Sequence, residues 1–74
     1  MKKHIFISYD READVMYLSF GKPVIDVGEE IETGVFAHYD AKTAQLVGLT
    51  IINFSKKLHR EPKGIAIPVL ASGK

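Results

Sequence analysis

The chain contains no cysteine and no tryptophan, and only three prolines among its 74 residues. Without thiols it cannot form a disulfide or a zinc site built on thiolates. No apolar stretch approaches the roughly 20 residues of a membrane-spanning helix. The apolar run at residues 5–7 is also too short for a signal peptide. The sequence therefore predicts one small cytoplasmic domain of marginal stability, with no membrane contact.

Sequence motifs for a cofactor or a nucleophile are also missing. No serine lies in a Gly-x-Ser-x-Gly elbow, and a domain this small seldom encloses a pocket. The basic cluster at residues 56–60 lacks the interleaved aromatic side chains on which nucleic-acid bases stack. We therefore expect a protein that is not an enzyme, needs no cofactor and does not bind nucleic acid.

Two groups of side chains are candidate metal ligands. The first group is Asp10, Glu12 and Asp14, which lacks the glycine and the downstream glutamate of a calcium loop. In the second group, His4 and His38 would need a third ligand such as Asp40. Turn formation and surface exposure explain these residues more simply, so we expect no metal. A small metal-dependent hydrolase remains an alternative.

The formal net charge of +1 conceals an uneven distribution of charge. Residues 4–55 hold three basic and eight acidic side chains, a balance of −5. Residues 1–3 and 56–74 together hold seven basic side chains and one acidic side chain, a balance of +6. An acidic body attracts a basic partner, although an ordinary soluble surface of mixed charge is the simpler reading.

Residues 4–9 and 15–20 predict a β-hairpin, because both are rich in β-branched and aromatic side chains and flank a polar turn. A four-residue loop pairs Asp10 with Val15, and the Asp10 carboxylate holds the turn. The more apolar face then contains Ile5, Ile7, Tyr9, Met16, Leu18 and Phe20. Phe6, Val15 and Tyr17 share the opposite face, where we predict that they form a partner-binding patch.

A weak internal repeat predicts a second hairpin. Residues 35–40 resemble residues 5–10 at an offset of 30, and both end in Tyr-Asp before a polar turn. The following strand runs over 46–54, with Val47, Leu49 and Ile51 on one face. Between the hairpins, residues 24–32 predict an irregular strand with a bulge at Gly28.

Beyond the second hairpin, Ser55 is a suitable N-cap for a short helix that ends before Pro62 and turns Leu58 inward. The predicted fold is α+β and mainly β: a small antiparallel sheet of two hairpins and the intervening strand, with one short C-terminal helix. Residues 1–61 form this single domain, and residues 62–74 form an extended tail.

The tail supplies a second set of predicted partner-binding residues. These residues alternate along the chain as Ile65, Ile67 and Val69. Pro68 has no N–H group, which restricts a strand here to the edge of a sheet. The tail would then add to the sheet of another subunit.

The chain resembles a bacterial family catalogued as domain of unknown function 2283. The resemblance covers roughly residues 5–58 and rests on the motif Tyr-Asp-x-Glu-Ala-Asp-x-Met-Tyr-Leu-x-Phe at 9–20. It continues with Tyr39-Asp40 and with Leu-Val-Gly-Leu-x-Ile-Ile at 46–52. The turn at 41–45 departs from the family, where it usually carries a glycine, and appears one residue longer. The resemblance implies a small β-rich domain without catalytic residues, encoded beside proteins that resemble ribonuclease-type toxins.

Three functions follow as hypotheses. The first is a non-catalytic protein-binding module, antitoxin-like in its most specific form, that binds a small basic toxin-like protein. The second is a self-associating structural domain, with a homodimer favoured, that uses its C-terminal strand. The third is the metal-dependent hydrolase.

Overall fold

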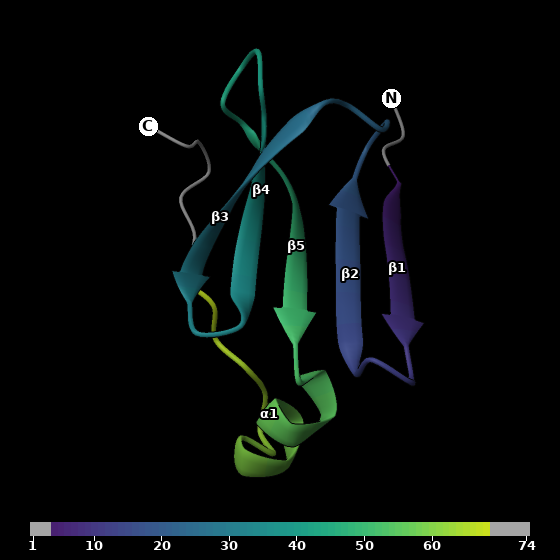
Figure 1. Ribbon diagram of the computed structural model, residues 1–74, viewed down its shortest axis with the longest axis vertical. Coiled ribbons are helices and arrows are strands. Elements are labelled where there is room, and N and C mark those ends of the chain that lie inside the picture. The colour runs from purple at the N-terminus through teal and green to yellow at the C-terminus, as the bar shows by residue number, and fades with distance from the viewer. Residues whose placement is uncertain (1–3, 69–74) are drawn as a thin grey trace.

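A computed structural model describes residues 4–68 of the chain (Figure 1). Five strands form one antiparallel sheet in the order β1-β2-β5-β4-β3, and a short helix follows. The elements are β1 (Ile5–Asp10), β2 (Val15–Phe20), β3 (Asp26–Glu32), β4 (Val35–Asp40), β5 (Leu46–Ile52) and α1 (Phe54–Arg60). The predicted fold class is confirmed. Within residues 4–68, no helix has the length and apolar character needed to cross a membrane.

The first hairpin has the register that its loop length predicts. Asp10 pairs with Val15 across a four-residue turn, and the pairing continues to the other end of the strands. The Asp10 carboxylate accepts hydrogen bonds from the N–H groups of Glu12 and Ala13, both at 3.1 Å. The predicted role of Asp10 in holding the turn is therefore confirmed. Asp14 closes the turn in the left-handed region, at φ 56°.

The second hairpin repeats this turn. The Asp40 carboxylate accepts hydrogen bonds from the N–H groups of Lys42 at 2.7 Å and Thr43 at 3.4 Å. Ala44 takes a left-handed φ of 63°, as Asp14 does in the first turn. The repeat in the sequence is thus a repeat of structure.

The extra residue of the second hairpin lies in its strand and not in its turn. Tyr39 pairs with Leu46 but His38 pairs with Gly48, which leaves Val47 as a bulge in β5. The predicted common face of residues 47, 49 and 51 is therefore interrupted at its first member. Simple alternation fails there because one residue of β5 has no partner on β4.

The two hairpins join through β2 and β5 (Figure 1). Leu18 pairs with Leu49, and these two residues hold equivalent positions in the two hairpins. A half-turn about an axis through this pair, perpendicular to the sheet, relates one hairpin to the other. Each face of the sheet maps onto itself under this rotation. The positions in β4 that correspond to Ile5, Ile7 and Tyr9 are Val35, Ala37 and Tyr39.

Strand β3 lies between the hairpins in sequence but at the edge of the sheet in space, beyond β4 (Figure 1). Its irregularity lies between Glu30 and Glu32. Gly28 pairs regularly with His38, so the predicted bulge at Gly28 is wrong. A Cβ atom at Gly28 would lie 3.4 Å from the His38 ring, so an alanine there would contact the imidazole and no backbone atom.

Helix α1 begins differently from the sequence prediction. Its N-cap is Asn53, in the left-handed region at φ 57°, and the Asn53 side chain makes no capping hydrogen bond within the described structure. Ser55 lies inside the helix, so its predicted capping role is wrong. Leu58 is 39% exposed and does not turn inward, because α1 lies beyond the ends of the strands rather than over a face (Figure 1).

The core of the molecule is small and lies mainly on one face of the second hairpin. The buried apolar residues are Val15, Val35, Ala37, Tyr39 and Ile51. All but Val15 lie on the face predicted to be the more apolar. Val35 also lines a shallow cavity together with Ile65 and Ala66, so the segment after α1 lies beside the start of β4.

Candidate functional site

The largest exposed apolar side chains of the sheet lie on β1. Phe6 is 68% exposed on one face, and Ile5 and Ile7 are 63% and 61% exposed on the other. Transfer of such side chains out of water is favourable by roughly 1.5–3 kcal/mol each when burial is complete. We call Ile5, Phe6 and Ile7 the β1 patch.

The corresponding residues of the second hairpin are covered by neighbouring segments, and the β1 patch is not. Val35 and Ala37 are 1% and 0% exposed, although they occupy the positions of Ile5 and Ile7. Strand β4 lies between β5 and β3, and the segment after α1 lies beside it. Strand β1 has only β2 as a neighbour in the described structure. The same sequence pattern is therefore covered in one hairpin and open in the other.

The predicted patch of Phe6, Val15 and Tyr17 is only partly an exposed surface. The three side chains share one face of the sheet, as the register predicts. Phe6 and Tyr17 are exposed, but Val15 is buried. Val15 lies between Asp10 of β1 and Ile52 of β5, which flank it on that face. The exposed apolar surface instead continues around the edge of β1 to Ile5 and Ile7.

The predicted tail residues lie differently from the expectation. Ile65 and Ile67 are half-buried and belong to no strand within residues 4–68. Ile65 contributes to the cavity beside Val35 of its own chain. Val69 lies outside the described residues.

The two edges of the sheet differ in chemistry. Between Ile5 and Tyr9, β1 carries no charged side chain, no proline and no register shift. Strand β3 carries four acidic side chains and a register shift, and its acidic residues are Asp26, Glu29, Glu30 and Glu32. Charges and bulges are devices that keep an edge strand from pairing with another chain. The β3 edge has such devices, and residues 5–9 of the β1 edge have none.

Asp14 connects the first hairpin to α1. Its carboxylate accepts hydrogen bonds from the Tyr9 hydroxyl, from the Ser55 N–H at 2.9 Å and from the Ser55 hydroxyl at 2.8 Å. The Phe54 N–H also donates to the Asp14 carbonyl at 3.1 Å. The bond from Tyr9 lowers the pKa of Asp14 from its ordinary value, with help from Ser55, and raises the pKa of Tyr9. Asp14 is thus a structural junction, which the sequence prediction missed.

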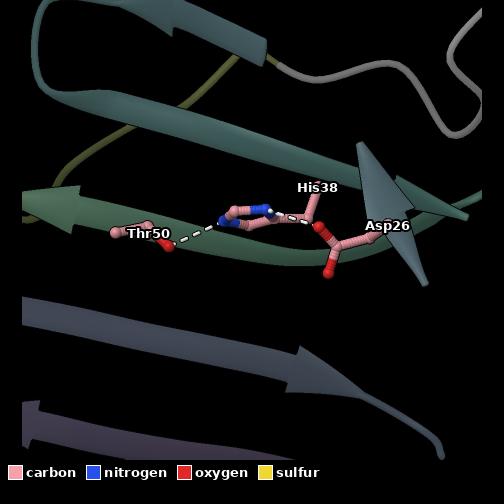
Figure 2. A network of polar contacts seen from close by, with 3 residues as sticks. All are labelled: Asp26, His38 and Thr50. Atoms are coloured by element: carbon pink, nitrogen blue, oxygen red, sulfur yellow. Dashed lines mark hydrogen bonds and ion pairs between the residues drawn. The ribbon is translucent and has the colours of Figure 1, made fainter. Parts of the chain in front are cut away.

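A second polar group, Asp26, His38 and Thr50, lies on the face that carries Phe6. Figure 2 shows its three side chains. His38 Nε2 and Thr50 Oγ1 share a hydrogen bond of 2.7 Å, in which the tautomer decides the donor. His38 Nδ1 lies 3.3 Å from Asp26 Oδ1. This contact is within ion-pair distance but lacks hydrogen-bond geometry, so the buried Nδ1 has no hydrogen-bond partner within the described structure. The sequence prediction considered His38 but missed Asp26 and Thr50, which the strand register brings to it.

This group has the carboxylate–imidazole–hydroxyl order of a hydrolytic triad, but its surroundings do not suit acyl transfer. Thr50 lies in β5, which has a hydrogen-bonded strand on each side. The backbone N–H groups near its hydroxyl therefore point into the ladder and are not free to stabilise an oxyanion. The group is better explained as a polar brace that ties β3 and β4 to β5.

The candidate metal ligands do not converge in the described part of the chain. Among residues 4–68, no three histidine, aspartate or glutamate side chains lie close enough to hold an ion. His38 contacts Asp26 rather than His4 or Asp40. Asp10 and Asp14 use their carboxylates for the turn and for α1.

Comparison with known proteins gives one match. The family model for proteins of unknown function designated DUF2283 matches residues 7–55, which span both hairpins except the first two residues of β1 and reach the start of α1. No curated protein and no solved structure matches the chain.

Proposed function

The chain belongs to the DUF2283 family of proteins of unknown function, and we propose that it is a non-catalytic protein-binding module. The β1 patch carries this proposal, because its side chains are exposed on both faces of an edge strand. A contiguous apolar surface bordered by polar groups is typical of a protein interaction site. An unpaired strand edge adds backbone donors and acceptors to that surface.

The charge distribution supports a small basic protein as a further partner, which is the antitoxin-like form of the proposal. The four acidic side chains of β3 project from the edge opposite the β1 patch. Such a field accelerates the approach of a basic protein and favours it over acidic ones. The β1 edge would then provide the apolar contact, and the negative charges of the β3 edge would favour a basic partner.

Co-expression with the protein encoded by the adjacent gene tests the basic partner. We expect the two proteins to purify together and the complex to weaken with salt. Glu29→Lys should weaken binding about 10-fold, because it reverses one charge of the acidic edge. Glu12→Lys, in the exposed first turn, is the matched control and should bind as the wild type does. A co-expressed basic protein that never binds, or equal effects of the two substitutions, would contradict this form of the proposal.

The absence of catalysis is tested on the Asp26–His38–Thr50 group. Thr50→Val removes the hydroxyl and preserves the shape of the side chain. We expect wild type and variant to hydrolyse an activated ester such as p-nitrophenyl acetate at the same low rate. A wild-type rate that falls at least about 100-fold in the variant would show a nucleophilic threonine and refute the proposal.

A further inference from the structure

The backbone of β1 faces outward at every second residue. The His4 carbonyl accepts a hydrogen bond from the Gly21 N–H at 2.9 Å, at the start of the β1–β2 ladder. Because backbone groups alternate in direction along an antiparallel pair, those of Phe6 and Ser8 also point toward β2. The N–H and C=O groups of Ile5, Ile7 and Tyr9 therefore point away from the sheet.

We propose that β1 pairs antiparallel with β1 of a second copy of this chain, about a twofold axis at Ile7. In this register Ile7 faces Ile7 of the second copy, and Ile5 faces Tyr9. Both pairs use the outward backbone groups, which forms one continuous sheet of ten strands across the dimer. The inference rests on the proposed function and names the partner of the β1 patch.

The distribution of exposed side chains favours edge pairing over a ligand on one face. Phe6 projects from one face of β1, and Ile5 and Ile7 project from the other. A partner lying on a single face would leave one of these sets in water. A strand beside β1 contacts both sets, since side chains of paired strands are neighbours on each face.

Charge favours a second copy and a closed dimer. Pairing about Ile7 places His4 opposite Asp10 of the second copy and brings no like charges face to face between residues 4 and 10. Pairing of β1 with β3 of another copy would place carboxylates beside the β1 patch, and it would extend without end because both edges would be used. Pairing of β3 with β3 would oppose carboxylates directly. The twofold pairing of β1 is the arrangement that closes and avoids these costs.

Sedimentation equilibrium of the full chain tests the dimer. We expect the wild type to have twice the 8.2 kDa mass of one chain. Ile7→Lys places two ammonium groups at the axis and should raise the dimer Kd at least about 100-fold. Ile25→Lys is the matched control: Ile25 is 83% exposed but lies outside β1, so this variant should remain dimeric. Circular dichroism checks that both variants are folded.

Cysteine cross-linking tests the register, and the absence of native cysteine makes it specific. Paired residues at the axis have Cα atoms roughly 5.5 Å apart, which suits a disulfide. Ile7→Cys should therefore cross-link to a dimer faster than Phe6→Cys or Ser8→Cys. A wild type that is monomeric at millimolar concentration, a dimer unaffected by Ile7→Lys, or faster cross-linking at Phe6→Cys or Ser8→Cys would each overturn the inference.

Failure of this inference can be told apart from failure of the proposed function. A monomer that still binds the adjacent gene's product would refute the twofold pairing and leave the binding module intact. A monomer that binds no protein would refute both.

Discussion

Replacement of Gly48 by alanine tests a close approach between the two hairpins. Gly48 lies in β5 between Ser19 of β2 and His38 of β4. A Cβ atom added there would lie 2.6 Å from the carbonyl oxygen of Leu18, closer than non-bonded carbon and oxygen atoms approach. The clash is with backbone, so β2 and β5 must move apart for an alanine to fit.

The expected magnitude follows from two opposing effects. Overpacking of this kind typically costs about 1–3 kcal/mol. Alanine recovers roughly 0.5–1 kcal/mol relative to glycine in a strand, because it has less conformational freedom to lose. Gly48→Ala should therefore lower the free energy of unfolding by about 1 kcal/mol, and by at most about 2.5 kcal/mol. In a domain of this size each kcal/mol corresponds to about 4–8 °C in Tm.

Urea denaturation in an Ile7→Lys background measures this effect without a contribution from dimer formation. Gly28→Ala is the matched control, since its added Cβ atom would approach only the His38 side chain, at 3.4 Å. We expect the control to be stabilised by about 0.5–1 kcal/mol, because alanine has less conformational freedom to lose and no backbone clash opposes the gain. Equal stabilities of the two variants would refute the close approach of β2 and β5 at Gly48.

Four further predictions concern the turns, the core and the dependence of stability on pH. Ala44→Gly should stabilise the domain by about 0.5–1 kcal/mol in urea denaturation, because glycine relieves a left-handed alanine at φ 63°; a loss of stability would contradict this. Val35→Ala should cost about 1–3 kcal/mol in the monomeric background, whereas Ile5→Ala at the equivalent open position should cost less than about 0.5 kcal/mol; similar costs would contradict the difference in burial. Asp14→Asn should lower Tm at pH 7. The pKa of Asp14 is lowered from its ordinary value of 3.8. The stabilisation by its carboxylate is therefore present above pH 3.8 and is lost as the pH falls toward the lowered pKa. The variant and the wild type should therefore converge in acid, and a constant difference in Tm would refute the role of the carboxylate charge. The raised pKa of Tyr9 predicts a further loss of stability as the pH rises above 10.0, visible as a falling Tm that is absent in Tyr9→Phe.

The first hairpin could be predicted residue by residue because two independent signals agree. Alternation of apolar side chains and the length of the loop select the same register, and Asp10 supplies the turn. The second hairpin carries the same signals, but the bulge at Val47 breaks the alternation. A bulge depends on how closely neighbouring strands approach, as they do at Gly48. The order of apolar and polar residues along the chain does not contain this information.

The start of α1 shows why residue preferences within a short segment did not predict the contacts at the candidate site. Ser55 satisfies the preference for a capping residue, but Asp14, distant in sequence, accepts both of its hydrogen bonds. The Asp26–His38 contact likewise depends on the register of β3 against β4, which shifts between Glu30 and Glu32 and so departs from simple alternation. Exposure of the β1 patch also required the sheet order, because the sequence places Ile5 and Val35 in equivalent patterns.

Hydrogen exchange at the backbone of β1 tests the central claim most directly. In the dimer, the N–H groups of Ile5, Ile7 and Tyr9 bond to the second copy, so NMR should show slow exchange at these three residues as well as at Phe6 and Ser8. In Ile7→Lys, the outward amides at residues 5, 7 and 9 should exchange rapidly while those of Phe6 and Ser8 stay protected. Rapid exchange of Ile5, Ile7 and Tyr9 in the wild type at millimolar concentration would contradict the account.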